Sequence, residues 1–147
     1  MNTVLLDTSV VSLFHPKNKE NPIRELYEPH MTGNILALSF QCVAELWKWA
    51  EENNWGSKKR EGLDSFIRMF LVLPYDYDLA KEWAKVNSVC NKQGRRLEAG
   101  DAWIIATAVH RKIPLITHDK DMVGLKIPDL KVISFVEKNL KANPHSG

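Results

Sequence analysis

The sequence predicts an α/β fold, with a single domain built on an open, mainly parallel sheet that is flanked by helices. Two observations lead to this prediction. Short apolar runs of the kind that form buried strands recur along the chain, and segments with apolar residues at helical spacing stand between them. An alternation of strands and helices is typical of parallel sheets, because the connection between two parallel strands is usually a helix.

The first half of the chain contains two of these strand–helix pairs. Residues 3–6 form an apolar run without alternation, which predicts a short buried strand, with a helix starting shortly after it. A second strand is predicted at 35–38, after the turn-forming Gly33 and Asn34. Ser39 is a suitable N-cap for the helix that follows, which would carry Glu45 in an early turn.

The second half continues the alternation. An apolar run at 69–73 is ended by a proline and followed by an amphipathic helix predicted for 78–89. Apolar residues at helical spacing predict a buried helix over 101–111. The last two strands are predicted at 115–117 and 131–135, which completes a βα alternation over most of the chain.

The length of 147 residues suits one domain with one hydrophobic core. We assign the domain to residues 1–140 and expect 141–147 to form a flexible tail. The composition, 44% hydrophobic and 26% charged, is ordinary for a globular protein, and the formal net charge of +2 is small. Composition alone therefore indicates no particular partner.

The sequence also favours a cytoplasmic protein. Cys42 and Cys90 form no CxxC pair, and a chain of this size needs no disulfide in order to fold. The N-terminus has an acid within its apolar stretch and no basic region before it, so it does not resemble a signal peptide. No apolar run approaches the roughly 20 residues of a membrane span, so no contact with a membrane is expected.

Acidic residues stand where the predicted strands end or the helices begin, namely Asp7, Glu45, Asp101 and Asp119. The C-terminal ends of parallel strands share one edge of the sheet, so these acids can meet there although they are far apart in sequence. Carboxylates in one crevice repel each other unless a cation lies among them. The pattern predicts a divalent metal site, and hard oxygen ligands favour Mg²⁺ or Mn²⁺.

Each acid also has an ordinary explanation when it is taken alone. Asp7 and Asp101 can cap helices, Glu45 can be a solvated helix residue, and Asp119 can belong to a turn. Capping and metal binding are compatible, because a helix start favours a carboxylate electrostatically. The occurrence of all four acids at expected strand ends favours the metal site.

Four segments carry a resemblance to a known family: LLDTSV near the N-terminus, AEL after the second strand, GDAWIIATAV at a central helix, and LITHDKDM at a late strand. Together, in this order, they make the chain similar to the PIN-domain nucleases, and most similar to the VapC-type toxin ribonucleases of prokaryotic toxin–antitoxin pairs. The resemblance implies a PIN-like domain and a metal-dependent endoribonuclease. It further implies a homodimer, an RNA substrate and a small antitoxin that covers the acidic crevice.

The resemblance carries four metal-site acids onto Asp7, Glu45, Asp101 and Asp119. Divalent ions held there would promote hydrolysis of a phosphodiester bond without a covalent nucleophile from the protein. The neighbouring HDKD segment offers Asp121 as an alternative fourth acid, and we choose Asp119 because it lies closer to the strand end. Side chains that can hydrogen-bond a phosphate or a bound water beside these acids are Thr8, Ser9 and Thr117.

An acidic crevice attracts an anionic polymer only with positive charge at its rim. Arg95 and Arg96 are the preferred candidates for RNA contact because they closely precede Asp101. Other basic clusters lie at 58–60 and 110–112, and Trp47, Trp55 and His118 are weaker candidates whose ordinary roles are packing or loop structure.

Other classes of function fit the sequence less well than a nuclease does. The chain has no paired His and Cys spacing for zinc and no Gly-rich phosphate loop. A haloacid-dehalogenase-like phosphatase can use an Asp at the end of its first strand as nucleophile, but such enzymes usually carry a second Asp where this chain has Ser9. A stand-alone RNA-processing PIN nuclease and a non-catalytic PIN-like binding scaffold are the remaining alternatives.

Overall fold

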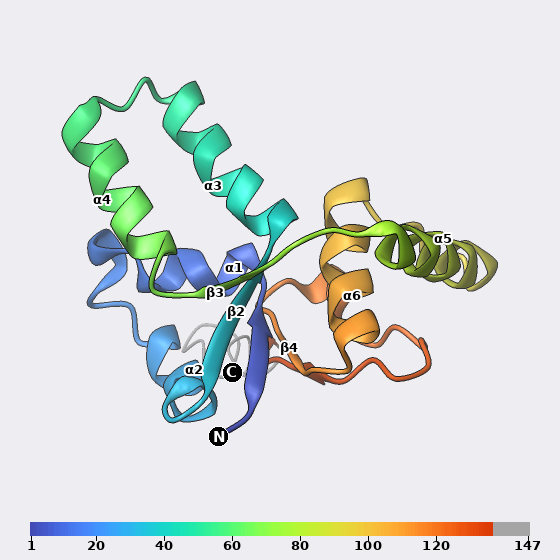
Figure 1. Ribbon diagram of the computed structural model, residues 1–147. Helices are drawn as coiled ribbons and strands as arrows, with labels where there is room; N and C mark the ends of the chain where they lie inside the picture. The colour runs from blue at the N-terminus through green and yellow to red at the C-terminus, as the bar shows by residue number, and fades with distance from the viewer. Residues whose placement is uncertain (137–147) are drawn as a thin grey trace.

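The computed structural model describes residues 1–136 and contains one five-stranded parallel sheet with the strand order β3-β2-β1-β4-β5 (Figure 1). The strands are β1 (Thr3–Leu6), β2 (Ile35–Ser39), β3 (Leu71–Leu73), β4 (Leu115–Ile116) and β5 (Val132–Ile133). Strand β1 is central and the chain leaves it first toward β2 and later toward β4. This reversal of direction places a topological switch point beside β1, where α/β proteins commonly bind ligands.

Helices connect the strands. They are α1 (Thr8–Val11), α2 (Ile23–Met31), α3 (Phe40–Glu52), α4 (Ser57–Ile67), α5 (Tyr77–Lys92) and α6 (Ala99–Arg111), with short 3-10 turns η1 (Ser12–Phe14), η2 (Pro16–Asn18) and η3 (Lys120–Met122). Helices α3 and α4 lie on one side of the sheet and α5 and α6 on the other (Figure 1). The domain is therefore a three-layer α/β structure.

The two faces of the sheet bury separate apolar clusters. Residues from α5 and α6 pack on one face together with Leu5 of β1, and residues from α1 to α4 pack on the other face together with Leu6. Adjacent strand residues point to opposite faces, so a strand covered on both sides must be apolar at every position. This requirement explains the unbroken apolar run at 3–6 that marked the first strand.

The predicted α/β class and parallel sheet are confirmed, and most predicted elements differ from the observed ones only at their ends. Ser39 caps α3 as predicted, because its Oγ accepts a hydrogen bond from the Cys42 backbone N–H at 3.1 Å. Helix α5 begins earlier than predicted because Asp76 caps it through the Leu79 N–H at 2.8 Å. The expected tail at 141–147 lies outside the described residues.

Two helices were not predicted from the sequence. Helix α2 has Pro22 at its N-cap position and Pro29 inside it, and these two prolines obscure the helical pattern. The first half of α4 is charged and only its second half supplies apolar residues to the core. Both helices contribute residues to the apolar cluster on the face of the sheet that α3 covers.

Two further features bear on the sequence predictions. Cys42 and Cys90 are buried free thiols, so neither forms a disulfide. Within residues 1–136, no helix is both long and apolar enough to cross a membrane.

Candidate metal and nuclease site

Asp7 follows the central strand β1 and is almost completely buried, with 4% of its surface exposed. It occupies the N-cap position of α1, yet its side chain caps nothing. Instead its Oδ2 accepts hydrogen bonds from Ser9 Oγ at 2.6 Å and from Thr117 Oγ1 at 2.8 Å. Burial raises the pKa of Asp7 above its ordinary value, and these two hydrogen bonds oppose the rise.

Glu45 projects from the second turn of α3, the helix that follows β2. Its Oε2 accepts a hydrogen bond from the Thr8 hydroxyl, and its Oε1 accepts one from Gln41 Nε2 at 3.1 Å. Thr8 follows Asp7 directly, so the first contact joins the end of β1 to α3. The second holds the carboxylate from within α3 itself, because residues four apart lie on the same helix face.

Asp101 lies in the first turn of α6, which begins at Ala99 rather than at Asp101 as predicted. Its pKa is raised to about 7, first by burial and then by the negative charges of Asp119 and Asp7, with smaller effects of Glu98 and Glu45. The charges that act on Asp101 thus come from three other segments of the chain. The fold brings the predicted acids to one region at the C-terminal edge of the sheet.

Asp119 and Asp121 differ in their surroundings. Asp119 is the N-cap of η3, and its Oδ1 accepts a hydrogen bond from the Asp121 N–H at 2.9 Å. Its negative charge raises the pKa of both Asp7 and Asp101. Asp121 is exposed and lies in the 3-10 turn from Lys120 to Met122. The surroundings therefore favour Asp119 as the acid nearer the crevice.

Hydroxyl groups join the ends of β1 and β4. Thr117 Oγ1 donates to Asp7 and accepts from the Asp119 N–H at 3.0 Å, while Ser9 Oγ accepts from the His118 N–H at 2.9 Å. These contacts fix the backbone of the 117–119 segment against the end of β1. The imidazole of His118 is engaged elsewhere, with its Nδ1 at 2.5 Å from Tyr27 Oη.

A cavity of about 330 Å³ opens between the N-terminal turns of α3 and α6. Its lining contains two of the predicted acids, Glu45 and Asp101. It also contains residues that the sequence had not singled out, which are Gln41, Ala44, Lys48, Glu98, Ala99 and Gly100. Gln41 and Lys48 stand four before and three after Glu45, so helical spacing around that acid could have identified both.

The acids have the chemistry of a hard cation site, since all of the candidate ligands are carboxylate oxygens. Within residues 1–136, however, no three acidic, His or Cys side chains are already drawn together as a complete ligand set. The carboxylates of Asp7 and Glu45 accept hydrogen bonds from hydroxyl and amide groups instead. Asp7, Glu45, Asp101 and Asp119 are the residues that could hold a metal ion.

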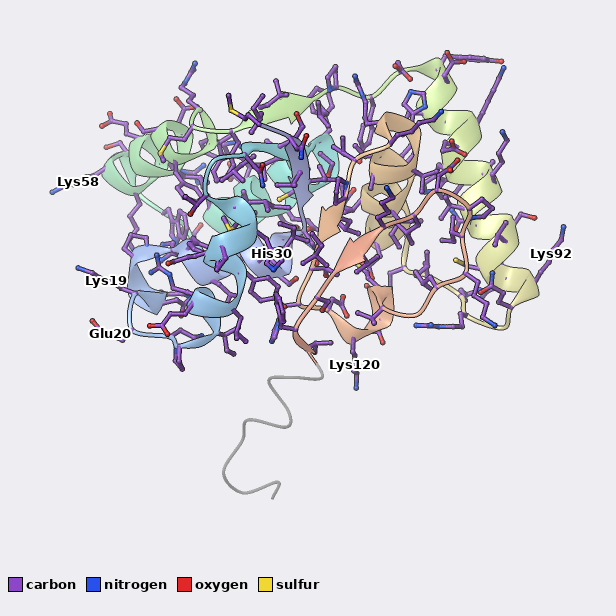
Figure 2. All side chains as sticks on the ribbon, turned by 90° about the horizontal axis from the view of Figure 1, so that it is seen from below. Lys19, Glu20, His30, Lys58, Lys92 and Lys120 are labelled. Atoms are coloured by element: carbon purple, nitrogen blue, oxygen red, sulfur yellow. The ribbon has the colours of Figure 1, made fainter. Side chains whose placement is uncertain are left out.

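The basic residues predicted to contact RNA are dispersed. Arg95 Nη2 donates to the Asp121 carbonyl at 3.3 Å, which ties the loop before α6 to η3, and Arg96 is exposed. Arg60 is bound to Glu51 at 2.9 Å. Lys58, Lys92 and Lys120 point outward on different sides of the molecule (Figure 2).

The remaining weaker candidates lie away from the acids. The cluster at 110–112 is at the C-terminal end of α6, about 15 Å from Asp101 along the helix axis. The Lys59 ammonium lies over the ring of Trp55, and Trp55 lines a separate cavity of about 660 Å³. Trp47 packs against the apolar cluster under α3.

Gly100 sets the approach of α6 to α3. A Cβ atom there would lie 2.8 Å from Gln41 Nε2 and 3.1 Å from Glu45 Oε1. Both contacts involve the ends of flexible side chains, so Gly100→Ala should cost less than about 1 kcal/mol in unfolding free energy while it displaces the Gln41–Glu45 pair. We expect metal affinity, measured by Mn²⁺ titration, to fall about 10- to 100-fold. Gly62→Ala in α4, where a Cβ meets nothing within 4 Å, is the matched control.

Comparison with known proteins assigns the chain to a family. Residues 4–127 match the family model described as PIN domain. Ribonuclease VapC5 of Mycobacterium tuberculosis is 42% identical over 54 residues, which cover 37% of this chain and 40% of that protein. The matched segment thus spans less than half the length of either protein.

Solved structures share the fold over nearly the whole chain. The structure of VapBC2 from Rickettsia felis bound to a promoter DNA fragment gives a TM-score of 0.75 at 16% identity, covering 90% of this chain and 98% of that one. The structure of VapBC-5 from Mycobacterium tuberculosis gives a TM-score of 0.62 at 26% identity, covering 90% and 98%. The chain belongs to the PIN domain family and consists of a single PIN domain that is similar to VapC toxins.

Proposed function

We propose that this protein is a Mg²⁺- or Mn²⁺-dependent endoribonuclease and that it is the toxin of a type II toxin–antitoxin pair. The observation that carries the nuclease proposal is the convergence of acids from four segments, whose negative charges add to the effect of burial in raising the pKa of Asp101 to about 7. An uncompensated cluster of this kind destabilises a fold, whereas a bound divalent ion makes it favourable. When bound, such an ion polarises a phosphodiester and activates water for attack.

The residues of the chain have distinct tasks in this proposal. Asp7, Glu45 and Asp101 hold the ion, and Asp119 is a peripheral ligand. Ser9 and Thr117 orient Asp7 through its Oδ2, and Thr8 orients Glu45. Because these donors are already in place, the carboxylates lose little conformational freedom when an ion binds.

RNA and an antitoxin are proposed partners on the strength of the relatives. VapC5 is named a ribonuclease, and the similar solved structures are complexes named VapBC. We infer that this chain acts on RNA in the cytoplasm, forms a homodimer and is inhibited by a small antitoxin. An Arg of such a partner is suited to the acidic cavity, because guanidinium pairs bidentately with carboxylates.

Expression in the native host tests the toxin proposal. Induction of the wild-type protein alone should slow growth, and co-expression with the small protein encoded next to it should restore growth. The Asp101→Asn variant, expressed at the same level, is the control for protein burden. Normal growth and an unchanged RNA pool on induction of the wild type would reject the toxin role and leave the nuclease proposal standing.

Cleavage of a labelled single-stranded RNA tests the nuclease proposal and the fourth ligand together. The wild-type protein should cleave in Mn²⁺ and stop in EDTA. Asp119→Asn should need about 10- to 100-fold more Mn²⁺ for half-maximal cleavage and recover partly at saturation, because a peripheral ligand affects metal affinity more than the chemical step. Asp121→Asn should behave like the wild type. A metal-rescuable defect in Asp121→Asn alone would reverse this assignment.

The alternatives predict different outcomes. As a phosphatase nucleophile Asp7 would form a covalent aspartyl-phosphate, which the nuclease mechanism does not require. Trapping that intermediate would establish the phosphatase chemistry. A binding scaffold would bind RNA without cleaving it in any metal, and a stand-alone processing enzyme would cleave RNA without an effect of antitoxin or on growth.

A further inference from the structure

Four aromatic rings form a continuous series beside the acidic cavity. Phe40 contacts Tyr75 with ring centroids 5.5 Å apart, Tyr75 stacks on Trp103 at 4.7 Å, and Trp103 stacks on Trp83 at 5.3 Å. Tyr75, Trp103 and Trp83 are partly buried and pack against the apolar cluster under α5 and α6. The buried end of the series is therefore anchored in the core.

The other end of the series is open to solvent. Phe40 is 46% exposed, and it directly precedes Gln41, which lines the acidic cavity. The Gln41 backbone N–H donates to Tyr75 Oη at 3.0 Å, so the start of α3 and the second ring are held together. Trp103 follows Asp101 by two residues on α6, and the series thus spans both helices that border the cavity. Phe40 thus presents an exposed ring that contacts Tyr75 and directly precedes a residue of the cavity lining.

Lys48 lies on the same face of α3 as Phe40, further along the helix. Phe40, Ala44 and Lys48 recur every four residues and are all exposed. Lys48 lines the cavity with Glu45, and its only ion pair among the described residues is a solvent-exposed contact of 3.5 Å with Glu52. Such a pair holds the ammonium weakly and leaves it available to another anion. The helix rises about 12 Å along its axis from Phe40 to Lys48, and Glu45 lies between them in height.

We propose that this face of α3 is a docking track for single-stranded RNA, in which Phe40 stacks on one unpaired base and Lys48 binds a phosphate beyond the cleavage site. The inference rests on the proposed nuclease function and names the residues that position its substrate. Aromatic rings combined with cations are the usual means of binding single strands without reading sequence. The carboxylates repel the backbone, so contacts on both sides of Glu45 hold the strand across them.

Binding in EDTA tests the stacking contact without cleavage. Fluorescence anisotropy with a dye-labelled, six-nucleotide RNA should show Phe40→Ala binding about 5- to 100-fold more weakly than the wild type, the range of one base–aromatic stack. Phe40→Trp should retain affinity and Phe40→Leu should lose it. Ile35→Ala is the matched control, because Ile35 is similarly exposed at 40% and lies at the other end of β2.

Abasic RNA separates stacking from a general effect on the fold. At one position, loss of the base should weaken wild-type binding as much as Phe40→Ala does, and it should have no further effect on Phe40→Ala. Lys48→Ala should reduce the slope of log Kd against log salt by about 0.7, and Lys48→Arg should keep it.

The inference is overturned if Phe40→Ala binds RNA as tightly as the wild type, or if it loses affinity equally for intact and abasic RNA. A dimer that dissociates in Phe40→Ala while RNA affinity is unchanged would assign the ring to a protein interface and also overturn it. If the wild type neither binds nor cleaves RNA, the proposed nuclease function fails along with the track. If it binds and cleaves RNA while Phe40→Ala does so equally, the track alone fails.

Discussion

Asp7→Asn is expected to lower RNA cleavage in Mg²⁺ by about a thousandfold. The amide keeps the size of the side chain but removes the charge that would hold the ion, and a bound metal contributes several kcal/mol to the stabilisation of such transition states. Asp7 is also buried and accepts hydrogen bonds from Ser9 and Thr117. Single-turnover cleavage of a labelled RNA at saturating Mg²⁺ measures the effect.

Asp129→Asn is the matched control for this variant. Asp129 is an exposed acid in the loop before β5, at the opposite edge of the sheet, and its φ of 67° suits asparagine as well as aspartate. The Asp129→Asn variant should cleave RNA at the wild-type rate. Asp101→Asn should share the defect of Asp7→Asn, and near-normal cleavage by either of these two variants would contradict the proposed mechanism.

The metal-free protein is expected to lose stability as the pH rises from about 4 to 7. The pKa of Asp101 is about 7 in the folded state and near its ordinary value of 3.8 when unfolded, so the folded state retains a proton that the unfolded state releases. This contribution is complete below pH 4 and disappears as the pH passes 7. Because Asp101 is only half-buried, solvent screening limits the loss to about 1–2 kcal/mol.

Urea unfolding in EDTA at pH 4.5 and pH 8 measures this loss. Asp101→Asn should reduce the difference between the two pH values and should be more stable than the wild type at pH 8. Mn²⁺ at about a hundred times its Kd should stabilise the wild type at pH 8 by roughly 2.7 kcal/mol. An Asp101→Asn variant that shows the full wild-type pH dependence would mean that this carboxyl is not the group responsible.

The parts of the fold that the sequence predicts are those with strong local signals. The apolar run at 3–6 and the Ser39 cap are visible in sequence because both-sided burial and helix capping each demand particular residues. Helix α4 was not predicted, because its burial depends on tertiary packing of Leu63, Phe66 and Ile67 more than on a pattern along its whole length.

The candidate site also has some features that the sequence predicts and others that it does not. The acids could be proposed from sequence because parallel strands deliver their C-terminal ends to one edge. The contribution of Gly100 could not, since it depends on the approach of α6 to Gln41. The contact of the Arg95 guanidinium with the Asp121 carbonyl could not be predicted either, because it is made across 26 residues of chain. Contacts between distant segments leave no local pattern in a single sequence.

The location of bound Mn²⁺ tests the central claim most directly. Crystals of the wild-type protein grown with Mn²⁺ should give an anomalous-scattering peak bounded by Asp7, Glu45, Asp101 and Asp119, and crystals of Asp101→Asn should show a weaker peak or none. A protein that cleaves RNA in Mn²⁺ but shows no peak among these acids, or shows it elsewhere, would contradict the account.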